Sequence, residues 1–92
     1  MLFRSLELEL AIPSADSLKA KRMVLRSLKD RVRRQFNVSV AELEDNDQWS
    51  VAGVAVVTVS NDRRFANRVL SKIVELVETQ HDLVLEIGRA HV

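Results

Sequence analysis

Apolar and polar residues alternate along positions 2–12, and this is the first clear pattern in the chain. Leu6, Leu8 and Leu10 fall on one side, and polar residues occupy most of the positions between them. A period of two is typical of a β-strand that has one buried face. Arg4 interrupts the apolar side once. The pattern therefore predicts a half-buried strand at the start of the chain.

The period changes to that of a helix over residues 17–35. Ser17 or Asp16 is expected to cap its first turn, because a short polar side chain can accept a hydrogen bond from the free amides there. Asn37 is expected to end the helix in the left-handed conformation. The apolar residues that recur on one side of this helix are Leu18, Leu25, Leu28 and Val32.

The second half of the chain contains the most strand-like segment, residues 49–60, which is apolar on both faces and is predicted to be a central strand. Gly53 within it indicates a bulge or a close approach of two backbones. Trp49 is expected to cover the core where this strand begins. The other elements predicted here are a short strand at 38–43, a helix at 62–79 and a last strand at 83–87.

This order of elements predicts an α+β protein with a ferredoxin-like βαββαβ sandwich, formed by a single domain over residues 1–92. The four-stranded antiparallel sheet would have the strand order 4-1-3-2, with both helices on one face. An uncovered apolar face usually forms an interface, which here would be a symmetric homodimer or a docking site for a partner protein. The residues expected on this face are Phe3, Ala52, Val54 and Val56, or else the alternate set in the third strand.

Charge is distributed unevenly along the chain. The formal net charge is +1, yet residues 17–35 contain eight basic residues against one acid, Asp30. Two interpretations stay open: a surface that binds a polyanion, or a solvated face that is partly paired with the acidic segment 42–47. The predicted nucleic-acid contacts are Lys19, Lys21, Arg22, Arg26, Lys29, Arg33 and Arg34, and Arg64 and Arg68 of the second helix are expected to extend this surface.

The chain lacks the residues that several classes of function require. The chain has no cysteine, so disulfides, thiolate catalysis and cysteine metal sites are excluded. It has no glycine-rich phosphate loop, and its acids and histidines lack the spacing of a metal site. We therefore expect no enzyme, cofactor, metal or small-molecule substrate. Charged residues interrupt the N-terminus, so we expect neither a signal peptide nor a membrane span, and a cytoplasmic location.

Four short motifs together resemble the YlxP-like family of small bacterial proteins, also called domain of unknown function 503. They are SLKAKR at 17–22, FNVSVAE at 36–42, the pair Asp47-x-Trp49, and VVTVSND at 56–62. The resemblance covers nearly the whole chain and implies the ferredoxin-like fold. It implies no activity, because none is established for the family. Family members tend to be encoded beside translation factors, including initiation factor two and ribosome-binding factor A.

These observations lead to one functional hypothesis and one alternative. The hypothesis is a non-catalytic accessory factor that binds structured or ribosomal RNA through the basic helix 17–35. The strands offer few aromatic side chains for stacking on bases, so the contact would be made by helices. The alternative is a partner-protein adaptor or dimerisation module that uses the uncovered sheet face.

Overall fold

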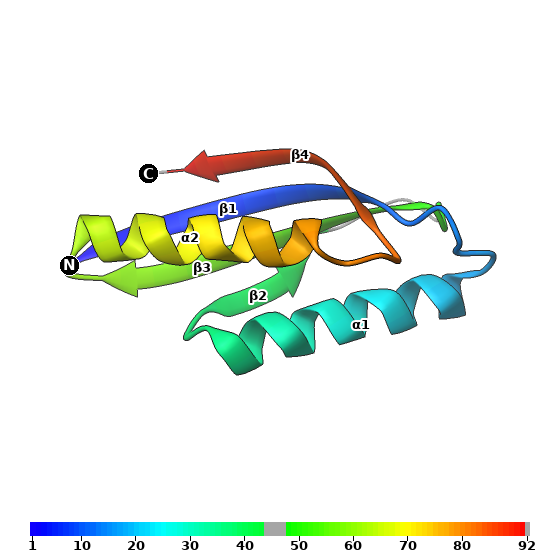
Figure 1. Ribbon diagram of the computed structural model, residues 1–92, viewed down its shortest axis with the longest axis horizontal. Helices are drawn as coiled ribbons and strands as arrows, with labels where there is room; N and C mark the ends of the chain where they lie inside the picture. Colours follow the sequence, from blue (N-terminus) through cyan, green and yellow to red (C-terminus); the bar gives the residue numbers. More distant parts are fainter. Residues whose placement is uncertain (44–47, 92) are drawn as a thin grey trace.

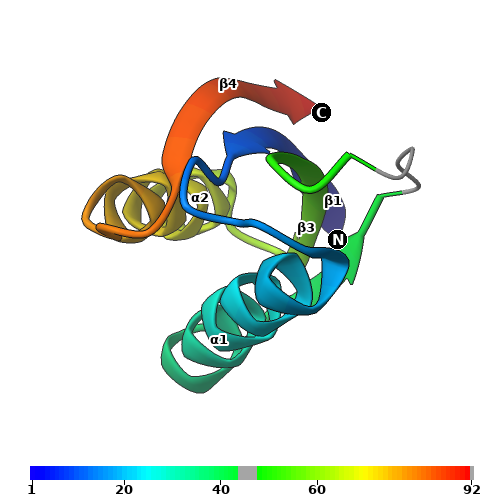
Figure 2. The ribbon, with the colours of Figure 1, turned by 90° about the vertical axis from the view of Figure 1, so that its right-hand side faces the viewer.

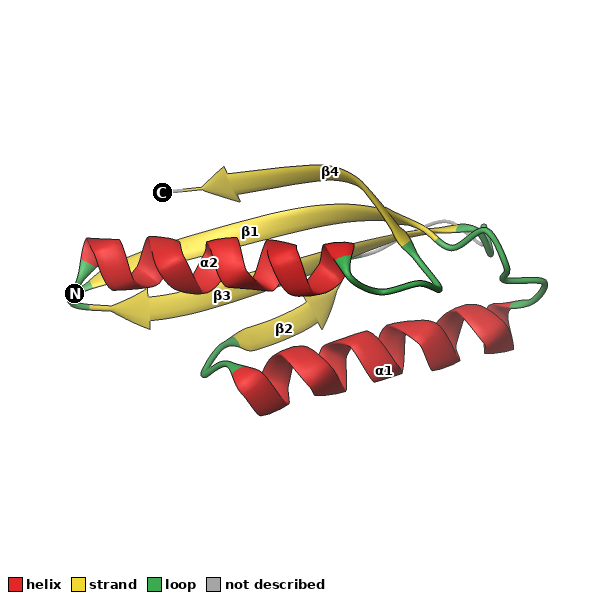
Figure 3. Cartoon of the chain, viewed as in Figure 1, coloured by secondary structure: helices red, strands yellow, loops and turns green. Residues whose placement is uncertain are grey.

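The computed structural model describes residues 1–43 and 48–91 of the chain. Each predicted element is present (Figure 1, Figure 3), and the ends agree within two residues except for the last strand, which was predicted to end at 87 and continues to His91. The elements are β1 (Leu2–Ala11), α1 (Leu18–Gln35), β2 (Ser39–Glu42), β3 (Val51–Ser60), α2 (Arg63–Glu78) and β4 (Val84–His91).

The four strands form one antiparallel sheet in the order β2-β3-β1-β4. This is the predicted order counted from the opposite edge, so the predicted ferredoxin-like fold is confirmed. The central strands β1 and β3 pair from Leu2 opposite Ser60 to Ala11 opposite Val51. Both helices lie on the same side of the sheet, which leaves its other face open (Figure 2).

The core lies between the sheet and the two helices. Alternate side chains of β1 point toward the helices, and α1 and α2 each contribute one buried stripe. Arg4 lies on the same side of β1 and is buried, and its Nη1 donates to the carbonyl oxygen of Phe3 at 3.0 Å. The largest fully buried side chains are Leu8, Leu10, Ile12, Leu25, Ile73, Val54, Val56 and Val77.

The first set of residues expected on the open sheet face is wrong for β3. Val54 and Val56 pair with Leu8 and Leu6 of β1, and directly opposite residues share a face of the sheet. Both valines are therefore buried under the helices, as is Ala52. The alternate set of β3 occupies the open face instead. Because β3 is apolar on both sides, its composition did not decide which side faces the helices.

The two ends of α1 test the expected caps. Ser17 is the N-cap, and its hydroxyl accepts a hydrogen bond from the amide of Ala20 at 3.0 Å. The prediction that Asn37 ends the helix in the left-handed conformation is wrong, because no non-glycine residue among those described has a positive φ. The chain instead becomes extended at Phe36, which leads it directly into β2.

The predictions for the two special positions of 49–60 have different outcomes. Trp49 does not cover the core: it precedes β3 and is 49% exposed. Gly53 does mark a close approach, since a Cβ built on it would lie 3.1 Å from the Cβ of Leu43. The amide of Leu43 also donates to the carbonyl oxygen of Gly53 at 2.8 Å.

In the described residues, neither helix combines the length and the apolar character that crossing a bilayer requires.

Candidate nucleic-acid interface

Helix α1 places cations on three different sides, and on the two flanks the described cations have hydrogen-bond or ion-pair partners. Leu25, Leu28 and Val32 fix the orientation of the helix, because they are buried against the sheet. The basic residues then lie on the flank next to β2, on the flank next to the end of α2, or on the outward surface. Each of these three groups has different partners.

The prediction that Lys21 contacts nucleic acid is wrong. Its side chain is only 4% exposed, and its Nζ donates to the carbonyl oxygen of Gln48 at 2.8 Å. It ties the segment before β3 to α1 and cannot reach a phosphate in solution. The sequence carried the signal for this, because Lys21 precedes Leu25, Leu28 and Val32 by four, seven and eleven residues, the spacing of one helix face.

Lys29 and Arg33 are held on the flank next to β2. The Nζ of Lys29 lies 2.6 Å from Oε2 of Glu42, and the Nη2 of Arg33 donates to the carbonyl oxygen of Val40 at 2.9 Å. The predicted pairing of basic helix and acidic segment therefore holds for Glu42. The other acids of that segment, Glu44, Asp45 and Asp47, lie outside the described residues. The side chains of both cations therefore already have a partner.

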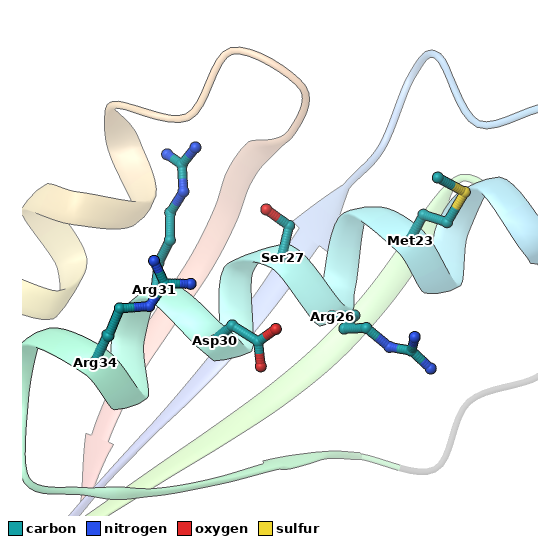
Figure 4. A pocket seen from close by; sticks show the side chains of 6 residues that line it. All are labelled: Met23, Arg26, Ser27, Asp30, Arg31 and Arg34. Atoms are coloured by element: carbon teal, nitrogen blue, oxygen red, sulfur yellow. The ribbon is translucent and has the colours of Figure 1, made fainter.

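Arg31 was not among the predicted contacts and lies on the flank next to α2. Its Nη1 donates to Oε1 of Gln80 at 2.7 Å, which joins α1 to the segment after α2. Figure 4 shows its side chain extending toward that segment, away from Arg26. The sequence indicated this position, because helical spacing puts Arg31 and the predicted basic stripe on opposite sides of the buried residues.

The outward surface of α1 carries the remaining predicted contacts. All of them are exposed, and among the described residues none takes part in an ion pair. Asp30 is the single acid among them, between Arg26 and Arg34 along the helix (Figure 4). We call this group the outer basic face, and it consists of Lys19, Arg22, Arg26 and Arg34.

Two open hollows lie along the outer basic face. One, of about 450 Å³, is lined by residues of the central and C-terminal turns of α1, including Arg26, Ser27 and Arg34. The other, of about 270 Å³, lies toward the N-terminus and is lined by Lys19, Arg22, Met23 and Arg26. Arg26 and the exposed Met23 border both hollows. The surface therefore offers shallow, positively charged contacts.

The structure does not bring Arg64 and Arg68 to the outer basic face, so their predicted continuity with it is wrong. They belong to the first turns of α2, which lie beyond the C-terminal end of α1 along the length of the molecule (Figure 1). The guanidinium carbon of Arg68 lies 5.8 Å from the centre of the Phe65 ring, a cation–π distance. The helices run in opposite directions with an offset, which the helix spacing in the sequence does not reveal.

The described side chains form no group that could hold a metal ion: nowhere in 1–43 and 48–90 do three His, Asp or Glu side chains gather. The chemistry that the outer basic face offers is hydrogen bonding and charge attraction to anions. Arginine donates in a planar fork that suits phosphate oxygens.

Comparisons with known proteins give a family and a fold. A family model described as "Protein of unknown function (DUF503)" matches residues 3–89. The uncharacterized protein YlxP of Bacillus subtilis (strain 168) is 31% identical over 83 residues, which cover 90% of this chain and 90% of that protein.

Two solved structures resemble this chain in fold. The de novo designed protein Foldit4 has a TM-score of 0.63 at 15% identity, over 99% of this chain and 98% of the designed one. A de novo designed protein described as having a ferredoxin fold has a TM-score of 0.59 at 15% identity, over 100% of this chain and 87% of the designed one. At this identity, the two designs support the fold alone.

Proposed function

The chain belongs to the DUF503 family of proteins of unknown function, and we propose that it is a non-catalytic accessory factor that binds structured RNA through the outer basic face. One observation carries the proposal: four exposed cations on one helix surface have no acidic partner in the described chain. Like charges on neighbouring turns repel each other, at a cost of a few tenths of a kcal/mol per pair. An external polyanion would remove that cost.

The dimensions of α1 suit a phosphate backbone. Lys19 and Arg34 are fifteen residues apart, which corresponds to about 22 Å along a helix. Each strand of a B-form duplex carries a phosphate about every 3.4 Å of helix axis, so a length of about 22 Å along the axis spans about six phosphates of one strand. Contacts of this kind fix position and register but carry no base sequence. Structured RNA, including ribosomal RNA, is the partner class we propose.

Recognition of bases by the sheet has less support. Sandwiches that bind single-stranded RNA stack bases on aromatic side chains of their central strands. In the part of the chain that the structure describes, the only aromatic residue within a strand is Phe3, at the beginning of β1. The proposal therefore places RNA on the helix side of the molecule.

The test is the salt dependence of binding to a labelled RNA hairpin and to small ribosomal subunits. If all four cations contact phosphates, log affinity should fall with log salt at a slope of about −3 to −4. A fourfold rise in salt should then weaken binding on the order of a hundredfold. The triple variant Arg22→Gln/Arg26→Gln/Arg34→Gln should lose most of this slope.

The chain offers a matched control for that variant. Arg63→Gln/Arg64→Gln/Arg68→Gln removes the same charge from the beginning of α2. It should retain most of the affinity and the slope, because these residues lie away from the outer basic face. If both triple variants weaken RNA binding equally, the loss of binding would reflect net charge alone and not the outer basic face. Binding that is unchanged by the α1 variant would end the RNA proposal.

A second candidate function has its own observation. The open sheet face exposes large apolar side chains, with Phe3 at 65% and Val59 at 49%. An adaptor that docks a partner protein on this face would show little salt dependence, and the α1 variant would not affect it. The two candidates are therefore separated by the same salt series.

A further inference from the structure

The open face of the sheet is unusually apolar for a surface. Phe3 of β1 and Val59 of β3 are a directly opposed pair on it, and both are exposed. Val57 and Val51 lie further along the same row of β3, and each is 38% exposed. Exposed apolar side chains that form a continuous patch usually mark an interface.

Charge divides this face into two halves. Described acidic and basic side chains occur only toward β1 and β4, where Arg89 Nη1 lies 3.7 Å from Glu9 Oε1. Glu7 is the cross-strand partner of Arg89, and Glu86 lines a hollow together with Glu9. Among the described residues, the other half carries no charged side chain, and we call it the uncharged half. It consists of Ser39, Ala41, Leu43, Val51, Gly53, Ala55, Val57 and Val59, with Phe3 at its border.

The size of the face is suited to one small interface. β1 and β3 pair over ten residues, so the face is about 34 Å long at about 3.4 Å per residue. Four strands spaced about 4.8 Å apart make it about 19 Å wide. Its projected area is therefore at most roughly 600 Å², because β2 spans only four residues and β4 eight, and the part over β2 and β3 is less than half of it. A standard interface buries about 800 Å² per partner.

We propose that a second copy of this chain covers the open face, with the β3 strands of the two copies packed across a two-fold axis. The uncharged half is complementary to itself, because apolar side chains meet apolar side chains and no charge is buried unpaired. The charged residues of β4 then lie at the rim, whereas Glu7 and Glu9 of the central strand β1 border the apolar contact beside β3.

Other occupants fit this face less well. Phosphate-bearing partners, whether RNA or an anionic membrane, meet Glu7, Glu9 and Glu86 against a single described base, Arg89. Addition of a strand at the β2 edge is limited, because β2 spans only four residues. Two apolar sheet faces packed about 10 Å apart are, in contrast, the ordinary arrangement of a β-sandwich. Interfaces of this small size are commonly transient, so we expect a dissociation constant of the order of micromolar.

Sedimentation equilibrium of Phe3→Glu tests the proposal, and Phe65→Glu is its matched control. Phe65 is also exposed, at 51%, but lies on α2. The wild type should change from monomer to dimer over micromolar concentrations, and Phe3→Glu should weaken the dimer at least about tenfold. Phe65→Glu should dimerise like the wild type. Wild-type protein that stays monomeric up to millimolar concentration overturns the proposal, and so does equal weakening by both variants.

A second measurement needs no substitution at all. In a dilution series of the wild type followed by methyl NMR, the methyl signals of Val51, Val57 and Val59 should shift with concentration. Those of Val69 and Val74, which are half-buried on α2, should not. Shifts confined to α1 or α2, or species larger than a dimer, would show that another surface associates and would reject the two-fold packing.

Discussion

Arg26 and Arg33 provide a strict test of how α1 divides its cations. The two residues lie seven positions apart on one stripe of the helix, and both are exposed. The structure distinguishes them, because Arg33 donates to the carbonyl oxygen of Val40 at 2.9 Å and Arg26 belongs to the outer basic face. We predict that Arg26→Gln lowers the salt dependence of RNA binding far more than Arg33→Gln does.

The size of the effect follows from the number of phosphates contacted. Four contacts give a slope of about −3.6, so a fourfold rise in salt weakens binding about 150-fold. Arg26→Gln leaves three contacts and a slope of about −2.7, for which the same change of salt weakens binding about 40-fold. Arg33→Gln should change the slope by less than half as much. It should instead lower the free energy of unfolding by about 1 kcal/mol, through the lost hydrogen bond to Val40.

Fluorescence anisotropy of a labelled RNA hairpin, measured at several salt concentrations, gives the slope for each variant. Urea unfolding followed by circular dichroism gives the stability. The reasoning fails if the two variants lower the slope equally, because the contacts of Arg33 with β2 would then be irrelevant to binding. It also fails if Arg33→Gln lowers the slope more than Arg26→Gln does.

Two further predictions concern stability. Lys21→Ala should lower the free energy of unfolding by about 2 kcal/mol, since it removes a buried aliphatic stem and the hydrogen bond to Gln48, while the salt slope of RNA binding stays at the wild-type value. A lower salt slope for this variant would show that Lys21 does contact RNA. Gly53→Ala should be less stable than Gly88→Ala by about 1 kcal/mol in urea, because only the first places a Cβ 3.1 Å from Leu43. Equal stabilities would show that Leu43 adjusts at no cost.

The fold was predictable because its signals are periodic and local. The alternation in β1, the helical stripes of α1 and α2 and the cap at Ser17 each depend on residues near one another in the sequence. The order of these elements, together with the handedness of crossovers, then leaves few arrangements. The end of α1 was less predictable, because a polar residue such as Asn37 permits the left-handed conformation without requiring it.

The errors share a different cause, which is contact between residues distant in sequence. β3 is apolar on both sides, so only its register with β1 decides that Val54 faces the helices and Val57 faces solvent. Arg33 and Lys29 have the same spacing as Arg26, yet their partners come from β2. Lys21 is the exception. Its helical spacing placed it in the buried stripe, but its charge led to the prediction that it contacts RNA.

The two proposed surfaces lie on opposite sides of the sheet, and this separation determines what a dimer can do. The open face would be covered by the second copy, while α1 of each copy remains on the outside. With sheets about 10 Å apart and a helix layer about 10 Å beyond each, the two α1 helices lie about 30 Å apart and face away from each other. They therefore cannot follow one phosphate backbone together. A dimer assembled in this way would join two separate RNA segments, and each copy would contribute the same few phosphate contacts.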